Sequence, residues 1–194
     1  MRLVVATRNE HKLGELAEIL TGFELVPLPA GLELPPEDGD TFEANALIKA
    51  RAARAAVGGA AVADDSGISA RALDGRPGVR SARFAGPDAS DEENLALLID
   101  ELRGVPDRRV VYICVLAHVA EDGTETLAEG GCEGVLIEEP RGSGGFGYDP
   151  AFVPDDTGPN DDRTMAELGA DEKHAISHRG RAARALAAAL GSPS

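Results

Sequence analysis

The sequence predicts an α/β fold built around a mixed sheet, and two observations support this prediction. In the N-terminal third, short apolar runs rich in β-branched residues alternate with segments of helical periodicity, which is typical of βαβ units. Further along, two longer apolar runs are joined at Asp122-Gly123, a dipeptide that favours a tight hairpin and so adds an antiparallel pair. The 194 residues correspond to one domain, which we place over residues 1–194.

The N-terminal elements follow from local patterns of apolar residues. In chain order they are a strand over 2–6, a helix over 13–20, a strand over 23–27, a helix over 41–57 and a strand over 60–63. Residues 28–40 are rich in proline and glycine, so we expect a surface loop between the second strand and the second helix. Gly58-Gly59 ends that helix.

The C-terminal elements are predicted by similar signals. Ser90-Asp-Glu-Glu93 has the pattern of a capping box, so a helix should start there and continue to about Arg103. The other elements are an irregular hairpin over 68–87, strands over 109–119 and 124–137, a glycine-rich loop after Pro140, a short helix over 163–168 and a last helix over 171–190.

The net charge is −15, from 34 acidic and 19 basic residues. Such a surface repels a polyanion, so we exclude long nucleic acid as a partner, although a local cluster of cations can still bind a small anion. The longest apolar run, over 110–120, is about half a membrane span, so we expect no membrane partner. Two cysteines require no disulfide framework, and we expect a reduced, cytoplasmic protein.

Lysine is unusually scarce in this chain. Of the 19 basic residues only Lys12, Lys49 and Lys173 are lysines, and all others are arginines. Arginine was therefore acceptable wherever a positive charge only had to be solvated, which makes these three lysines candidates for a functional site. The alternative is that they remain on the surface by chance.

Two polar segments each follow a predicted N-terminal strand. Thr7-Arg8-Asn9-Glu10-His11-Lys12 lies before a helix, where free backbone amides, a hydroxyl and a lysine suit a phosphate, although any polar loop at this place would look similar. Asp64-Asp65-Ser66 places two carboxylates at a strand end, which suits a divalent metal or general-base catalysis. The alternative for the second segment is an ordinary turn or helix cap.

Two further segments lie in the C-terminal part. Gly142 to Pro150 combines glycines with Phe146 and Tyr148, rings that could stack on a planar base or, alternatively, fill the core under a tight loop. Lys173 and His178 are five positions apart, so they share one face only if the last helix is interrupted between them. A solvated basic helix end is the alternative for this segment.

Seven segments taken in order resemble the inosine triphosphate pyrophosphatase family. They are ATRNEHK, TFEANALIKA, ADDSG, LDGRPGVRSARFAG, GSGGFGYDP, RTMAEL and EKHAISHRG, and the likeness extends over residues 3–190. The resemblance implies a long, twisted mixed sheet flanked by helices, two lobes with a central active-site cleft, and a homodimer. It also implies Mg²⁺-dependent hydrolysis of the non-standard purine nucleoside triphosphates ITP, dITP and XTP to the monophosphate and pyrophosphate, which cleanses the nucleotide pool.

The resemblance also implies roles for individual residues. Asp65 is the expected catalytic base, and Glu37 and Asp65 are the expected Mg²⁺ ligands. The residues expected to bind substrate are Thr7, Arg8, Asn9, Glu10, His11, Lys12, Lys49, Ser66, Phe146, Gly147, Tyr148, Asp149, Lys173, His178 and Arg179. Arg179 and backbone amides are candidate donors to the 6-oxo group of the base, and Asp64 is expected to matter less than Asp65.

The chain departs from the family pattern at one helical position. Where the family has Glu-Asn-Ala, this chain has Ala44-Asn45-Ala46, and Glu43 lies about 100° away around the helix, so it does not replace the missing acid. Two other functions remain as alternatives: an inactive nucleotide-binding protein, which the two metal-binding acids disfavour, and a phosphomonoesterase, which would release orthophosphate instead of pyrophosphate.

Overall fold

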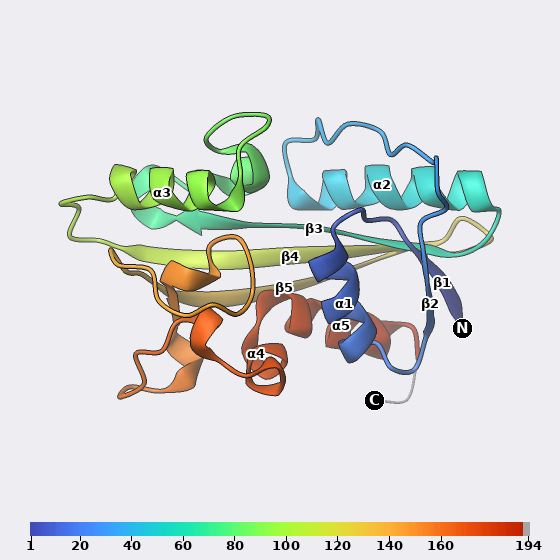
Figure 1. Cartoon of the computed structure of the whole chain (residues 1–194). Helices are drawn as coiled ribbons and strands as arrows, with labels where there is room; N and C mark the ends of the chain where they lie inside the picture. The colour runs from blue at the N-terminus through green and yellow to red at the C-terminus, as the bar shows by residue number, and fades with distance from the viewer. Residues whose placement is uncertain (192–194) are drawn as a thin grey trace. The chain divides into compact units, whose positions relative to one another are not determined.

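The computed structural model describes residues 1–191 and has one mixed sheet with the strand order β2-β1-β3-β4-β5-β6 (Figure 1). β1 pairs in parallel with β2 and β3, whereas β5 and β6 are antiparallel. The strands are β1 Arg2–Val5, β2 Glu24–Pro27, β3 Ala61–Ala70, β4 Arg109–Val119, β5 Glu125–Leu136 and β6 Phe152–Pro154. The predicted α/β class with a mixed sheet is confirmed.

The helices mostly begin and end where their caps predict. The α-helices are α1 Glu10–Ile19, α2 Phe42–Val57, α3 Asp91–Glu101, α4 Ala170–Ile176 and α5 His178–Ala189. Short 3-10 turns are η1 Arg71–Leu73, η2 Gly78–Arg83, η3 Asp149–Ala151, η4 Asp155–Thr157 and η5 Met165–Glu167. Thr41 caps α2, which ends at Gly58 in the left-handed conformation, and Ser90 and Glu93 form the predicted capping box of α3.

The chain divides into two compact units, each with its own core. Unit 1 contains Met1–Asp65, Cys114–Gly130 and the chain from His178 onward, and unit 2 contains Ser66–Ile113 and Gly131–Ser177. In unit 1, α1 and α5 pack side by side (Figure 1), with buried apolar side chains such as Leu16 and Leu186. In unit 2, residues of α3 and β6, including Leu98 and Phe152, form a second core. The single domain over 1–194 stays a prediction.

The structure corrects four boundaries. β3 is not a short strand over 60–63, because it continues through both aspartates to Ala70. The expected irregular hairpin over 68–87 is therefore the end of β3, a Ser69–Pro77 bridge and the turns η1 and η2. α1 starts at Glu10, and the last helix is two helices separated at Ser177, whose ψ of 153° is extended. The three-residue strand β6 was not predicted.

Gly67 lets the turn η2 pack closely against the end of β3 in unit 2. A Cβ at this position would lie 2.4 Å from Ser81 Oγ and 2.5 Å from the Gly78 carbonyl oxygen, so only glycine lets η2 approach the strand this closely. Ser81 Oγ then accepts a hydrogen bond from the Ile68 amide at 2.9 Å. No helix within residues 1–191 is long and apolar enough to cross a membrane.

Candidate functional site

All three lysines are largely buried and paired with carboxylates. The exposed fractions of their side chains are 17% for Lys12, 7% for Lys49 and 9% for Lys173. Lysine is almost never fully buried unless it is paired, so these positions are not chance survivors on the surface. Each lysine lies in a segment that the sequence singled out.

The N-terminus of α1 in unit 1 is the first of these places. Asn9 caps the helix by accepting a hydrogen bond from the Lys12 amide at 3.1 Å, and Thr7 Oγ1 accepts one from the Asn9 amide at 3.1 Å. Lys12 Nζ lies 3.0 Å from Asp64 Oδ2. A capped helix N-terminus beside an ammonium group is an environment suited to a phosphate.

Asp64 is the centre of a buried chain of alternating charges in unit 1. Its Oδ2 also lies 3.2 Å from Arg179 Nη2, while Arg179 Nη1 donates to Glu15 Oε2 at 2.5 Å. The side chains of Asp64 and Arg179 are 1% and 2% exposed. Burial alone would raise the pKa of Asp64, but Lys12 and Arg179 outweigh it and hold this pKa well below its usual range. Asp64 is therefore ionised at neutral pH and holds two cations.

Asp65 has a different environment on the next position of β3. Its Oδ2 accepts a hydrogen bond from Asn45 Nδ2 at 3.0 Å, and its Oδ1 lies 3.7 Å from Lys49 Nζ, which also donates to Glu37 Oε1. Burial raises the pKa of Asp65; Lys49 opposes this shift and Glu37 adds to it. Burial would lower the pKa of Lys49, but the nearby carboxylates of Asp64, Glu37 and Asp65 hold it above its usual value.

The Glu37 and Asp65 carboxylates fit the requirements of Mg²⁺. Both carboxylates pair with the Lys49 ammonium group, so an oxygen atom of each already faces the same positive charge. Within residues 1–191, no group of three or more His, Cys, Asp or Glu side chains is arranged to hold a metal ion. Mg²⁺ does not require one, because it commonly binds through one or two carboxylates, substrate phosphates and water.

Asp149 is the centre of a cluster of hydrogen bonds in unit 2 that includes Tyr112, Phe146 and Lys173. Its Oδ2 accepts hydrogen bonds from Lys173 Nζ at 2.8 Å and from the Phe146 amide at 3.1 Å, and its Oδ1 accepts one from Tyr112 OH at 3.1 Å. Burial and the Asp149 charge raise the pKa of Tyr112 well above its usual value, so the phenol stays a donor. Lys173 Nζ lies 5.1 Å from the centroid of the Phe146 ring, in a cation–π contact.

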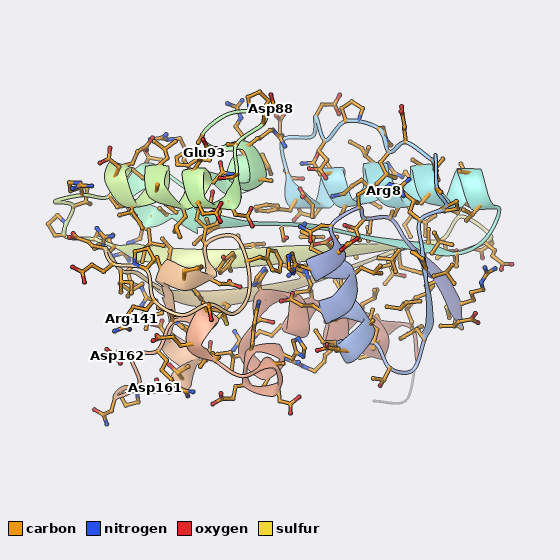
Figure 2. All side chains as sticks on the ribbon, viewed as in Figure 1. Arg8, Asp88, Glu93, Arg141, Asp161 and Asp162 are labelled. Atoms are coloured by element: carbon orange, nitrogen blue, oxygen red, sulfur yellow. The ribbon has the colours of Figure 1, made fainter. Side chains whose placement is uncertain are left out.

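The glycine-rich loop of unit 2 is fixed at both ends. Arg141 Nη1 donates to Asp162 Oδ2 at 3.2 Å, and the two labelled side chains lie close together in Figure 2. Farther along the loop, the Tyr148 amide donates to Tyr112 OH, and Tyr148 OH donates to the Ser81 carbonyl oxygen at 2.7 Å. Tyr148 is only 5% exposed, so its ring fills the core and is not a stacking face, whereas the Phe146 ring is half-buried.

The comparison with models of protein families identifies the family of this chain. A model of the Ham1 family matches residues 3–189. The chain belongs to the Ham1 family. It is 50% identical over 197 residues to a dITP/XTP pyrophosphatase from Mycolicibacterium paratuberculosis, covering 97% of this chain and 95% of that protein. It is 44% identical to another of that name from Shigella flexneri, covering 97% of this chain and 98% of that protein.

Solved structures of Ham1 proteins have the same fold as this chain. A HAM1 protein from Coxiella burnetii superposes with a TM-score of 0.87 at 38% identity, covering 98% of each chain. A nucleoside-triphosphatase, dITP/XTP pyrophosphatase, from Mycobacterium abscessus superposes with a TM-score of 0.76 at 45% identity, covering 98% of this chain and all of the other. The family resemblance of the seven sequence segments is confirmed.

Several expected substrate-binding residues have other partners in this Ham1 chain. Arg8, labelled in Figure 2, donates to the carbonyl oxygens of Leu28, Pro29 and Leu32 at 3.4, 3.0 and 2.6 Å, so it holds the 28–40 loop. Arg179 belongs to unit 1 and binds carboxylates there, as described above. Its expected role as a donor to the 6-oxo group of a base stays a prediction.

The remaining expected residues lie as follows. Glu10 and His11 are exposed in the first turn of α1, and His178 is 5% exposed at the start of α5. Ser66 is half-buried on β3, and the Gly147 amide donates to Asp91 Oδ2 at 2.8 Å. The amides of 146, 147 and 148 thus all donate to protein groups, and the expected role of backbone amides as donors to a base stays a prediction.

Sequence reasoning missed four residues that organise the two clusters, namely Glu15, Asn45, Asp91 and Tyr112. Glu15 had a signal, because it lies three positions after Lys12 and so on the same face of α1. Each of the other three bonds to a carboxylate or amide that is 20 to 56 positions away in the chain, and no local sequence pattern predicts contacts over such separations.

Proposed function

We propose that this protein hydrolyses the non-standard purine nucleoside triphosphates ITP, dITP and XTP to the monophosphate and pyrophosphate, with Mg²⁺ as cofactor. The observation that carries the proposal is the cluster of Glu37, Lys49 and Asp65 in unit 1, next to the pair of Lys12 and Asp64. Relatives of this chain that are named dITP/XTP pyrophosphatase support the choice of substrate class.

The proposal assigns the phosphate chemistry to Lys12, Glu37 and Asp65. Lys12 and the N-terminus of α1 bind the triphosphate as positive charge and backbone donors. Glu37 and Asp65 would hold Mg²⁺, which when bound would neutralise charge on the departing pyrophosphate and orient the attacking water. Asp65 accepts the proton of that water as its oxygen bonds to phosphorus, and the bond between phosphorus and the bridging oxygen of the α,β-anhydride breaks with its electron pair going to the leaving group.

Burial of Asp65 suits it to this task. A general base works best when its pKa is raised toward the working pH, and burial raises the pKa of Asp65. Asp64, whose pKa is held far below its usual range, is a poor proton acceptor. Of the two adjacent aspartates, Asp65 is therefore the catalytic one, and Asp64 holds Lys12 in place.

The proposal assigns recognition of the base to Phe146 and Lys173. The half-buried Phe146 ring offers a face for stacking on a purine, and Lys173 places a positive charge beside that ring. A cation beside the base favours a 6-oxo acceptor over a 6-amino donor, which distinguishes ITP and XTP from ATP. Asp149 and Tyr112 hold both groups in position.

A steady-state screen tests the proposal. Purified protein with Mg²⁺ is assayed against ITP, XTP, dITP, GTP and ATP, with pyrophosphate and orthophosphate measured separately. We expect pyrophosphate from ITP, dITP and XTP, with kcat/KM orders of magnitude above that for ATP. Orthophosphate as the product would favour the phosphomonoesterase alternative, and comparable rates with ATP and ITP would refute the base recognition.

Two further parts of the proposal concern the assembly state, which comes from the family resemblance, and the location and partners, which come from the net charge, the cysteine count and the short apolar run. We propose that the protein is a cytoplasmic homodimer with no nucleic-acid or membrane partner. Light scattering after size-exclusion chromatography measures the dimer directly, because the chain mass is 20.1 kDa and a dimer doubles it. A monomeric mass across the micromolar range would contradict this part.

A further inference from the structure

Asn45 is a buried side chain of α2 that the proposed mechanism does not use. It is 0% exposed, and both polar atoms of its amide have partners within unit 1. Asn45 Nδ2 donates to Asp65 Oδ2 at 3.0 Å, and Asn45 Oδ1 accepts from the Gly39 amide at 2.8 Å. The two partners fix the orientation of the amide, because a carboxylate needs a donor and a backbone N–H needs an acceptor.

The Gly39 contact places the loop that carries Glu37. Gly39 lies two positions after Glu37, and a Cβ at position 39 would lie 2.8 Å from Asn45 Oδ1 and 2.9 Å from Ala44 Cβ. Only glycine lets the loop approach α2 this closely. Asn45 therefore contacts Asp65 directly and holds the main chain next to Glu37.

Glu37 and Asp65 are thus connected by two bridges of different character. One is ionic, because Lys49 Nζ pairs with both carboxylates. The other is neutral and runs from Asp65 through the Asn45 amide to Gly39. A cation that enters between the carboxylates competes with the Lys49 ammonium by charge repulsion, whereas a neutral amide has no charge to be repelled.

We propose that Asn45 is a positioning residue that keeps Asp65 and the Glu37 loop in place when a divalent cation displaces the Lys49 ion pairs. The expected effect on kcat rests on the proposed function, whereas the expected effect on the affinity for a divalent cation does not. Neither alanine nor aspartate could take this role, because alanine offers no hydrogen bond and an ionised aspartate cannot donate one to Asp65.

The test compares Asn45→Ala with a matched control, Asn94→Ala. Asn94 is also a buried asparagine on a helix, and it belongs to unit 2. Its side-chain amide accepts a hydrogen bond from Ala85 N at 2.8 Å and donates one to Ala82 O at 3.3 Å. Three quantities are measured for each variant: the Tm, kcat and KM with ITP and Mg²⁺, and the affinity for Mn²⁺ alone, from the electron paramagnetic resonance signal of the free ion.

We expect Asn45→Ala to lower kcat by about tenfold or more with KM for ITP within about threefold, and to weaken Mn²⁺ binding by about fivefold. Asn94→Ala should lower the Tm without changing kcat or Mn²⁺ affinity. A folded Asn45→Ala variant with wild-type kcat and Mn²⁺ affinity would overturn the proposal, as would equal losses of kcat in both variants.

Gly39→Ala keeps the proposal testable if Asn45→Ala does not fold. This loop variant leaves Asn45 intact but forces the Glu37 loop away from it, so Mn²⁺ affinity and kcat should again fall, and wild-type values would overturn the proposal. If the wild-type protein releases no pyrophosphate from ITP, the proposed function fails. The comparison of Mn²⁺ affinities then still decides the role of Asn45.

Discussion

Replacing Asp64 by asparagine tests whether this residue is structural, against the sequence-based expectation that it is a mild control for Asp65. The change keeps the shape of the side chain and removes one negative charge. That charge is paired with Lys12 Nζ at 3.0 Å and with Arg179 Nη2 at 3.2 Å, and the Asp64 side chain is 1% exposed. Asp64→Asn therefore leaves a guanidinium group buried with Glu15 as its remaining carboxylate partner among the contacts described above.

The magnitude follows from the burial of the pair. Removing one partner of a buried ion pair costs about 3–5 kcal/mol, because the other charge stays desolvated and uncompensated. We take the lower end, about 3 kcal/mol, because Glu15 still neutralises part of the Arg179 charge and because Lys12 is 17% exposed and reaches solvent. For a domain of this size, that loss corresponds to a fall in Tm of about 6–12 °C.

Asp65→Asn is the internal comparison, with the opposite pattern of effects. Because burial raises the pKa of Asp65, its charged form is costly in the fold, and the neutral amide should change the Tm by no more than about 2 °C. Its kcat should nevertheless fall by about 10²–10⁴. Differential scanning calorimetry without divalent cations and steady-state ITP hydrolysis measure the two effects. A Tm for Asp64→Asn within 2 °C of wild type would refute the buried ion-pair reasoning.

Three further predictions concern charge and hydrogen bonding. Because the folded pKa of Asp64 is below its unfolded value, its stabilisation is complete above about pH 4 and lost as the pH falls further, so the Tm gap between wild type and Asp64→Asn should close in acid. Lys12→Arg should lower kcat/KM for ITP at least tenfold, about 1.4 kcal/mol, whereas Arg103→Lys, at an exposed side chain, should change nothing in the same assay. Tyr112→Phe should cost about 1–3 kcal/mol in urea unfolding and raise KM for ITP, because Asp149 and the Tyr148 amide each lose a partner; unchanged unfolding would contradict the role of the phenol.

The sequence predicted elements whose causes are local. The Thr41 cap and the Gly58 stop of α2, the Ser90 capping box and the turn at Asp122-Gly123 each depend on residues that are neighbours in the chain. Patterns of a few residues are sufficient for such features, because the backbone groups that they satisfy belong to the same segment. The scarcity of lysine likewise pointed to three positions that the structure shows to be buried and paired.

The continuation of β3 through Asp64 and Asp65 could not be predicted from local sequence. Two adjacent acids predict a strand end, because isolated buried carboxylates are costly. They are tolerated here because cations from α1, α2 and α5 neutralise them, and these partners are remote in sequence. Tyr148 is a similar case. A ring in a glycine-rich loop suggests a stacking face, but its hydroxyl donates to the Ser81 carbonyl oxygen, which is 67 positions away, and the ring is buried.

The contacts of Arg8 with three main-chain carbonyl oxygens have a consequence for how this chain tolerates change. Every residue type has a carbonyl oxygen, so the guanidinium group does not read the side chains of Pro29 and Leu32, and substitutions there leave the contacts intact. A deletion of one residue between Leu32 and Glu37 is different, because it pulls the Glu37 carboxylate away from Lys49 while Arg8 holds the start of the loop. Positions 29 and 32 are therefore free to change in composition, whereas the number of residues between them and Glu37 is restricted.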